Sequence, residues 1–340
     1  MGNCCVTPQP QQQPQPPGWS RGVSGGQPAL PPAEPYPASA TIPEGSSLRQ
    51  FTTDELVAAT NDFSRVIGEG GFGRVYHGRL IHPPGPEGRE LEVAVKVMAA
   101  EHITGGVSSF QVEVASMTAM RHPNVLQLLG FVCDSPSPVL VYEYIPRGDC
   151  TEFLKASSKG EVHFPWRARM IVALGCAEAL AAIHEANYVH RDFKASNVLL
   201  REDLTAVLAD FGLAKAVTDW ATHVSTRVMG SMGYIDPIYF QSGQLSRKSD
   251  TYAFGVFLLE LVSGRLALEE QFQELRRLVV AKTFPDPDLV VDQRIQGEWS
   301  KKHVYITFTL IRFAISFDWE HRPSMSVMRD KMKTIVDEIA

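Results

Sequence analysis

The stretch His190-Arg191-Asp192-Phe193-Lys194-Ala195-Ser196-Asn197 gathers several polar side chains of chemical interest within a few positions. Asp192 offers a carboxylate that can orient a hydroxyl group and accept its proton. Lys194 adds a positive charge two residues later, and Asn197 adds a side-chain oxygen of the kind that Mg²⁺ binds. A loop of ordinary solvated charges explains none of these spacings. The stretch therefore indicates a reaction centre.

Other short signatures flank this stretch. Those before it are Gly68-Glu69-Gly70-Gly71-Phe72-Gly73, Val93-Ala94-Val95-Lys96 and Glu113, and Asp210-Phe211-Gly212 follows it. Glycines let backbone N–H groups approach anionic oxygens closely. A dinucleotide-binding turn of the same spacing needs a helix directly after the loop, whereas Arg74-Val75-Tyr76-His77 continues as a strand. An ordinary glycine hairpin stays open as an alternative for this motif alone.

Together and in this order, the signatures resemble those of eukaryotic protein kinases over roughly the last 280 residues. The resemblance implies a two-lobed α+β kinase fold, with a small, mostly β lobe at about 61–145 and a larger, mostly α lobe at about 146–340. It implies ATP as the phosphoryl donor and Mg²⁺ as the cofactor, with Mn²⁺ as the alternative ion. Lys194 matches the serine/threonine branch, so the resemblance predicts transfer to serine or threonine of a protein substrate.

The resemblance also assigns roles to single residues. Asp192 accepts the proton of the attacking hydroxyl, Lys194 faces the γ-phosphate, and Asn197 and Asp210 hold the metal. Ser231 is expected to be a substrate-binding hydroxyl. Among the catalytic residues, Arg191 binds a phosphate on the activation segment, unless it only caps nearby backbone carbonyls. The candidate phosphate acceptors are Thr222, Ser225 and Thr226.

The implied nucleotide site draws on both lobes. Lys96 pairs with Glu113 and contacts the α- and β-phosphates. The alternative for Glu113 is an ordinary solvent-exposed charge on a helix. The remaining residues cover the phosphates, enclose the adenine or bind it through backbone groups. The full predicted set is Ile67, Gly68, Gly70, Gly71, Gly73, Val75, Ala94, Lys96, Glu113, Tyr142, Glu143, Ile145 and Leu199.

Composition excludes several other classes of protein. With 340 residues, 44% of them hydrophobic, the chain can bury a substantial core. Its net charge of −6 and the lack of long basic runs argue against a nucleic-acid partner. The five cysteines are irregularly spaced, which favours a reducing compartment over a disulfide framework. The most apolar helical stretch, 252–262, is too short to cross a bilayer and carries Glu260.

The first fifty residues differ from the rest. Residues 1–50 are rich in Pro, Gln and Gly and are predicted to be a disordered tail, while 51–340 form the kinase domain. Thr53–Thr60 is predicted to be a short leading helix. At the start, Gly2 is a candidate for myristoylation and Cys4 and Cys5 for palmitoylation. Two such lipid signals are needed for stable attachment; unmodified, reduced cysteines in the tail are the alternative.

Several stretches resemble plant receptor-like kinases, among them Phe51-Thr52-Thr53-Asp54-Glu55-Leu56 and His223-Val224-Ser225-Thr226-Arg227-Val228-Met229-Gly230. The chain is similar to receptor-like cytoplasmic kinases. The resemblance implies a relay downstream of a receptor kinase, at the cytoplasmic face of the plasma membrane, or in the cytoplasm if the anchor is not modified. A kinase fold that signals by docking, with weak or no activity, is the alternative, and a small-molecule kinase is disfavoured.

One position departs from the kinase pattern. Asp236-Pro237-Ile238 occupies the place of the family's Ala-Pro-Glu, so the glutamate is replaced by Ile238. In the family that glutamate pairs with an arginine that matches Arg322. We therefore expect Arg322 to be a buried cation that has lost its partner, with Glu320 or Asp318 as candidate substitutes. A second departure is a lean stretch between Gly264 and Val304, where a helix on the substrate side should lie.

Overall fold

The computed structural model describes residues 48–339, except 71–72, 83–88, 100–108, 133–136, 218–223 and 282. The predicted tail, with Gly2, Cys4 and Cys5, lies outside the described residues, as do Gly71 and Thr222.

The first half of the described chain forms a six-stranded sheet in the order β1-β5-β6-β4-β3-β2. The strands are β1 (Arg49–Gln50), β2 (Val66–Gly70), β3 (Gly73–His82), β4 (Arg89–Met98), β5 (Leu128–Val132) and β6 (Val139–Glu143). Neighbouring strands are antiparallel except β1 and β5, which are parallel. Helix α2 (Ser109–Ala119) lies between β4 and β5 in the chain. The sheet and its single long helix are the small lobe predicted from the sequence.

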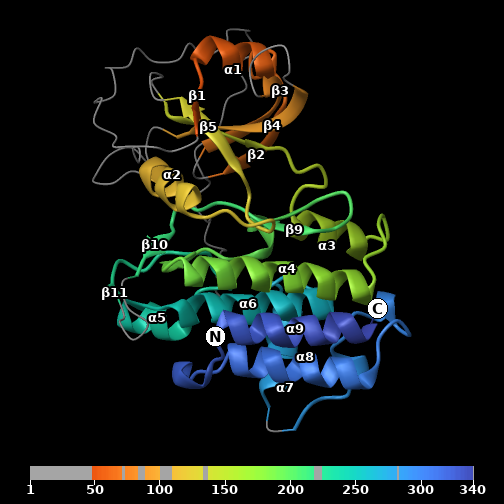
Figure 1. Ribbon diagram of the computed structural model, residues 1–340. Coiled ribbons are helices and arrows are strands. Elements are labelled where there is room, and N and C mark those ends of the chain that lie inside the picture. The colour runs from red at the N-terminus through yellow and green to blue at the C-terminus, as the bar shows by residue number, and fades with distance from the viewer. Residues whose placement is uncertain are drawn as a thin grey trace, which may run out of the picture. The chain divides into compact units, whose positions relative to one another are not determined.

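Helix α1 (Thr53–Thr60) lies between β1 and β2 in the chain and contacts β3 (Figure 1). Its N-terminus is closed by a capping box between Thr52 and Glu55. Phe51 and Leu56 are buried against Val93 and Val141 of the sheet. A Cβ on Gly130 would lie 1.9 Å from the Arg49 carbonyl, so β1 can approach β5 only at a glycine.

The second half is helical. Its helices are α3 (Cys150–Ser158), α4 (Trp166–Glu185), α5 (Pro237–Ser242), α6 (Arg247–Ser263), α7 (Glu270–Val280), α8 (Lys301–Ala314) and α9 (Met325–Ile339). Helix α4 packs against α6 and α9, and α8 packs against α6, so these helices stack in layers (Figure 1). Helix α6 is buried along nearly its whole length, as expected of a helix that is apolar on all sides.

Short strands and turns connect the helices, and Asp192, Asn197 and Asp210 lie in or beside them. The strand pairs are β7 (Tyr188–Val189) with β10 (Lys215–Ala216), β8 (Val198–Leu200) with β9 (Ala206–Leu208), and β11 (Val224–Ser225) with β12 (Gln244–Leu245). Turns of 3₁₀ helix cover Ala195–Asn197, Pro287–Leu289, Gln293–Ile295 and Trp319–His321.

The predicted fold is therefore confirmed, with differences in detail. The stretch between Gly264 and Val304 is less lean than its sequence suggests, because it contains α7. Within the described ranges, no helix is both long enough and apolar enough to span a bilayer.

Candidate functional site

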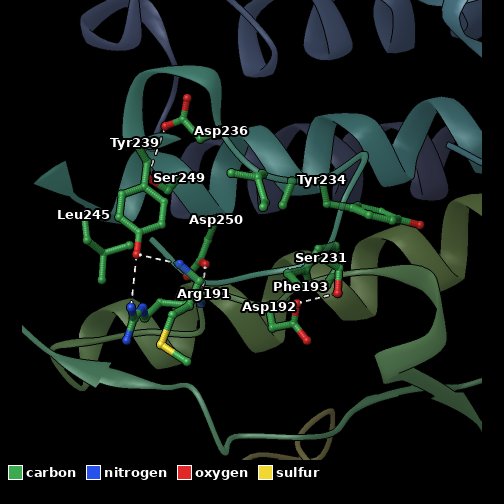
Figure 2. Close-up of a pocket in the computed structure, with 13 residues that line it drawn as sticks. Arg191, Asp192, Phe193, Ser231, Tyr234, Asp236, Tyr239, Leu245, Ser249 and Asp250 are labelled. Atoms are coloured by element: carbon green, nitrogen blue, oxygen red, sulfur yellow. Dashed lines mark hydrogen bonds between the residues drawn. The ribbon is translucent and has the colours of Figure 1, made fainter. Parts of the chain in front are cut away.

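Asp192 lies at the centre of a small hydrogen-bonded cluster. Its Oδ1 accepts a hydrogen bond from the Ser231 hydroxyl at 2.8 Å, as Figure 2 shows, and its Oδ2 lies 2.9 Å from Lys194 Nζ. Lys194 Nζ also donates to Ser231 Oγ at 2.7 Å. Asn197 donates from Nδ2 to the Asp192 carbonyl at 2.8 Å. The four side chains predicted from separate positions are thus brought into one site.

Helix α6 fixes the backbone at the start of the loop 190–197 through Asp250. Asp250 accepts hydrogen bonds from the amides of His190 at 2.8 Å and Arg191 at 3.0 Å, and His184 Nε2 lies 2.9 Å from the same carboxylate. Burial opposes the ionisation of Asp250, but its hydrogen bonds and the two histidines hold the pKa of this carboxyl below its ordinary value. A buried carboxylate that stays charged can hold Arg191 in the left-handed conformation it adopts, with φ of 70°.

Lys96 joins the two lobes. Its Nζ donates to both oxygens of Glu113, at 3.2 and 3.0 Å, and to Asp210 Oδ1 at 3.0 Å. Burial disfavours a charged lysine, but the two carboxylates raise the pKa of Lys96 above its ordinary value. Burial likewise opposes the charge of Asp210, yet Lys96 holds the pKa of that carboxyl below its usual range. The predicted pairing of Lys96 with Glu113 is present in the structure, and Asp210 shares it.

Asp210 and Asn197 supply an oxygen-rich donor set. Since the Asn197 amide nitrogen donates to Asp192, its carbonyl oxygen is the atom that can face a cation. Asp210 lines the same cavity as Asn197, and Lys96 lowers the pKa of its carboxyl, which favours the charged form. Carboxylate and carbonyl oxygens are the ligands that Mg²⁺ takes from proteins. The residues present therefore fit this ion.

A cavity of about 650 Å³ opens between the sheet and the helical part. Among the described residues predicted to bind ATP, all line it, together with Asn197 and Asp210. Tyr142 lies at its wall and donates from its hydroxyl to Glu113 Oε1 at 2.5 Å. Leu126, Asp149, Ser196 and Ala209 also line the cavity and were not predicted.

Comparison with known proteins also indicates the kinase family. The family described as protein tyrosine and serine/threonine kinase matches residues 62–332. The EPD1-interacting receptor-like cytoplasmic serine/threonine-protein kinase 5D of Gossypium barbadense is 37% identical over 328 residues, which cover 89% of this chain and 69% of that protein. The probable serine/threonine-protein kinase PBL4 of Arabidopsis thaliana is 39% identical over 295 residues, which cover 82% of this chain and 70% of that protein. The chain belongs to the plant receptor-like cytoplasmic serine/threonine kinases.

Arg191 contacts the activation segment of this kinase. Arg191 Nη2 donates to the Arg227 carbonyl at 3.0 Å, to the Tyr239 hydroxyl at 3.0 Å and to Thr226 Oγ1 at 3.5 Å (Figure 2 draws the contact with Tyr239). Of the three candidate acceptors, Thr226 is the one whose side chain the structure describes, and it lies beside Arg191. Arg191 also caps carbonyls, so both sequence interpretations have contacts in their favour.

The expectation that Arg322 lacks a partner is wrong. Its guanidinium binds the Asp236 carboxylate, and its Nε donates to the Ser316 carbonyl at 2.8 Å. Neither Glu320 nor Asp318 is the substitute. Asp236 precedes Ile238 by two positions. Its short side chain reaches Arg322 because Asp236 lies against the start of α6, where it accepts the Ser249 hydroxyl. The sequence could not reveal this exchange.

Tyr234 and Asp149 are further residues that sequence reasoning missed. The Tyr234 hydroxyl donates to the buried Glu260 and accepts the Ala195 amide at 3.3 Å, so it links the activation segment to the catalytic loop and to α6. Asp149 caps α3 by accepting the Glu152 amide at 3.0 Å while it lines the cavity between the sheet and the helical part. The capping position was a usable signal for Asp149, since an aspartate before a helix is common there.

Proposed function

We propose that this kinase transfers the γ-phosphate of ATP to a serine or threonine hydroxyl of a protein, and that it acts as a membrane-associated relay downstream of a receptor kinase. The observation that carries the first part is the hydrogen bond from Ser231 Oγ to Asp192 Oδ1 at 2.8 Å. A hydroxyl group is already accommodated at the carboxylate that would receive the proton of a substrate hydroxyl.

The surrounding residues support this chemistry. Asp192 orients the attacking hydroxyl and takes its proton, while Lys194, 2.9 Å from Asp192, places positive charge on the side where the transferred group would lie. Lys96 is held by Glu113 and Asp210 in the cavity and would bind nucleotide phosphates. Mg²⁺, held by Asp210 and Asn197, would neutralise charge on the phosphates.

The test is phosphorylation of a generic basic acceptor by the purified full chain. Asp192→Asn removes the proton acceptor and Lys96→Arg disturbs the phosphate contact, so each should lower kcat by about 10² or more. Asp330→Asn, which changes an exposed aspartate on α9, serves as the matched control and should leave kcat unchanged. Equal activity in all four proteins would refute the proposed chemistry.

The alternative of a docking-only kinase fold is not favoured. Its main argument was the loss of the glutamate at Ile238, which was expected to leave the activation segment untied. Asp236 ties that segment to Arg322 at 2.7 and 2.8 Å, and the contacts of Lys96, Asp192 and Asn197 are complete. Weak transfer by the wild type, no better than by Asp192→Asn, would revive this alternative.

The relay part rests on the kinship with receptor-like cytoplasmic kinases and on Gly2, Cys4 and Cys5, which lie outside the described residues. One acyl chain binds membranes only marginally, so we expect both signals to be used. Gly2→Ala should move the protein from the membrane to the soluble fraction, whereas Gln9→Ala in the same tail should not. Replacing Cys4 and Cys5 by Ser should leave weak, reversible binding. A Gly2→Ala protein that still sediments with membranes would exclude the anchor.

A further inference from the structure

Two arginines connect the hinge, defined here as residues 142–149, to the turn between β8 and β9. Arg147 lies in the hinge and donates from Nε to the carbonyl of Glu202 in the turn, at 3.0 Å. Arg201 lies at the other end of this connection and reaches back to the hinge, with Nη2 3.1 and 2.9 Å from the two carboxylate oxygens of Glu143. Each segment therefore provides one arginine and one acceptor.

Glu143 has a second partner. Its Oε1 accepts the Gln127 amide at 3.0 Å, while the Gln127 carbonyl accepts the Glu143 amide at 3.1 Å. One carboxylate thus joins the residues before β5, the end of β6 and the end of β8. The first two segments belong to the sheet and the third to the helical part. This side chain therefore crosses from one lobe to the other at the point where they are joined.

A second cavity meets the hinge at Glu143. This cavity, of about 600 Å³, is lined by Met117, Met120 and Leu128 among others. Leu126 and Glu143 line this cavity and the nucleotide cavity as well. A wall in a packed interior is held by its neighbours on both sides. The Glu143 side chain borders both cavities, so its ion pair with Arg201 and its bond to Gln127 add to the restraint that the pairing of β6 with β4 gives the backbone.

The restraint acts on the nucleotide cavity. Leu199 lies on β8 two residues before Arg201, and Asn197 directly precedes β8. On the opposite side, Glu143 and Ile145 are the residues whose backbone groups face the adenine in the proposed site. The pair formed by Arg201 and Glu143 therefore sets the separation between the two surfaces that would enclose the base.

We propose that Arg201 is a positioning residue that, through Glu143, fixes the geometry of the adenine pocket and so raises the affinity for ATP. The proposal rests on the proposed ATP site. Arg201 itself does not line the nucleotide cavity. The competing interpretation is an ordinary surface ion pair, since 36% of the Arg201 side chain is exposed, but Glu143 is only 18% exposed and has its third bond to Gln127.

The test compares Arg201→Gln with Arg277→Gln in the full chain. Arg277 forms an ion pair with Glu274 at 3.2 Å on the exposed face of α7 and serves as the matched control. Calorimetric titration with Mg-ATP should give a Kd for Arg201→Gln about three- to fivefold above that of the wild type, the range for a partly exposed ion pair. The value of kcat at saturating ATP should change less than about twofold. Arg201→Lys should recover part of the affinity.

A double-mutant cycle and a measurement without nucleotide complete the design. Glu143→Gln combined with Arg201→Gln should bind ATP no more weakly than the weaker single mutant. Without ATP, the Gln127 amide should exchange its hydrogen faster in Arg201→Gln than in Arg277→Gln. If the wild type binds no ATP, the proposed nucleotide site is refuted. The exchange measurement then still tests whether the ion pair between Arg201 and Glu143 restrains the hinge. Equal Kd values for Arg201→Gln and Arg277→Gln, or equal exchange at Gln127, would overturn the inference.

Discussion

Arg322 and Asp236 form a buried, bidentate ion pair, with Nη1 2.7 Å from Oδ2 and Nη2 2.8 Å from Oδ1. Both side chains are almost completely buried. Asp236 also accepts the Ser249 hydroxyl at 3.1 Å and the Ile238 amide at 3.0 Å, so the same carboxylate caps α5. Parallel hydrogen bonds of this kind are among the strongest that arginine makes. The pair ties the end of the activation segment to the start of α6 and the residues before α9.

The first prediction follows from this pair. Asp236→Ala leaves a buried guanidinium without its anion and should lower the free energy of unfolding by about 3–5 kcal/mol. Ile238→Glu should bring no gain in stability, because Arg322 is already paired and a second carboxylate must be desolvated. Asp318→Ala removes an exposed cap and an exposed contact with His321 and should cost about 1 kcal/mol. Urea unfolding of the three variants measures these differences, and a more stable Ile238→Glu protein would contradict the assignment.

The second prediction concerns control by phosphorylation. Thr226 Oγ1 lies 3.5 Å from Arg191 Nη2, whose other acceptors are a carbonyl and a hydroxyl. A phosphate on Thr226 adds close to two negative charges and should replace these neutral acceptors. Thr226→Ala should lower kcat while the melting temperature stays within a few degrees, and Thr309→Ala on α8 serves as the control. Active protein without phosphate between Lys215 and Arg227, as judged by mass spectrometry, would count decisively against this switch.

The third prediction is a pH dependence of stability. Burial raises the pKa of Glu260 from an ordinary value of 4.5 to about 8 in the folded protein, although hydrogen bonds from Tyr234 and Ala267 oppose the shift. The folded state then binds more protons than the unfolded state between these two values. The contribution of Glu260 to stability is therefore complete below about pH 4.5 and is lost as the pH rises through about 8. Glu260→Gln should flatten the fall in unfolding free energy over this window; an unchanged slope would remove Glu260 as its source.

The fourth prediction compares the free-energy cost of backbone strain with the cost of a steric clash. Gly264 and Gly297 both adopt left-handed conformations, with φ of 64° and 86°. A Cβ on Gly264 would lie 2.3 Å from Asp292 Oδ2 and 2.5 Å from Arg294 Nη2, whereas a Cβ on Gly297 meets nothing within 4 Å. Gly297→Ala should thus cost only about 1 kcal/mol of conformational strain. Gly264→Ala should cost clearly more, because Asp292 is fixed by Arg169 at 2.6 Å. Equal decreases in melting temperature for the two variants would show that Asp292 and Arg294 move aside at little cost in free energy.

Local sequence signals predicted the parts of this kinase whose structure depends on neighbours in the chain. The prediction of a helix at Thr53–Thr60 and of a strand through 74–77 placed α1 and part of β3, because capping residues and local residue preferences act between chain neighbours. The ordered signatures around Lys96, Asp192 and Asp210 predicted the family and the residues that line the nucleotide cavity. The resemblance supplied roles that composition and periodicity alone do not contain.

Contacts between residues far apart in the chain were decided by the tertiary structure. The sequence indicates that Ile238 has lost a carboxylate, but only the fold places Asp236 against Arg322, 86 positions away. The same holds for Arg201 at Glu143 and for Tyr234 at Glu260. The physical reason is that a motif records local geometry and burial, whereas the partner of a buried charge is chosen by which chain segments packing brings within hydrogen-bonding distance.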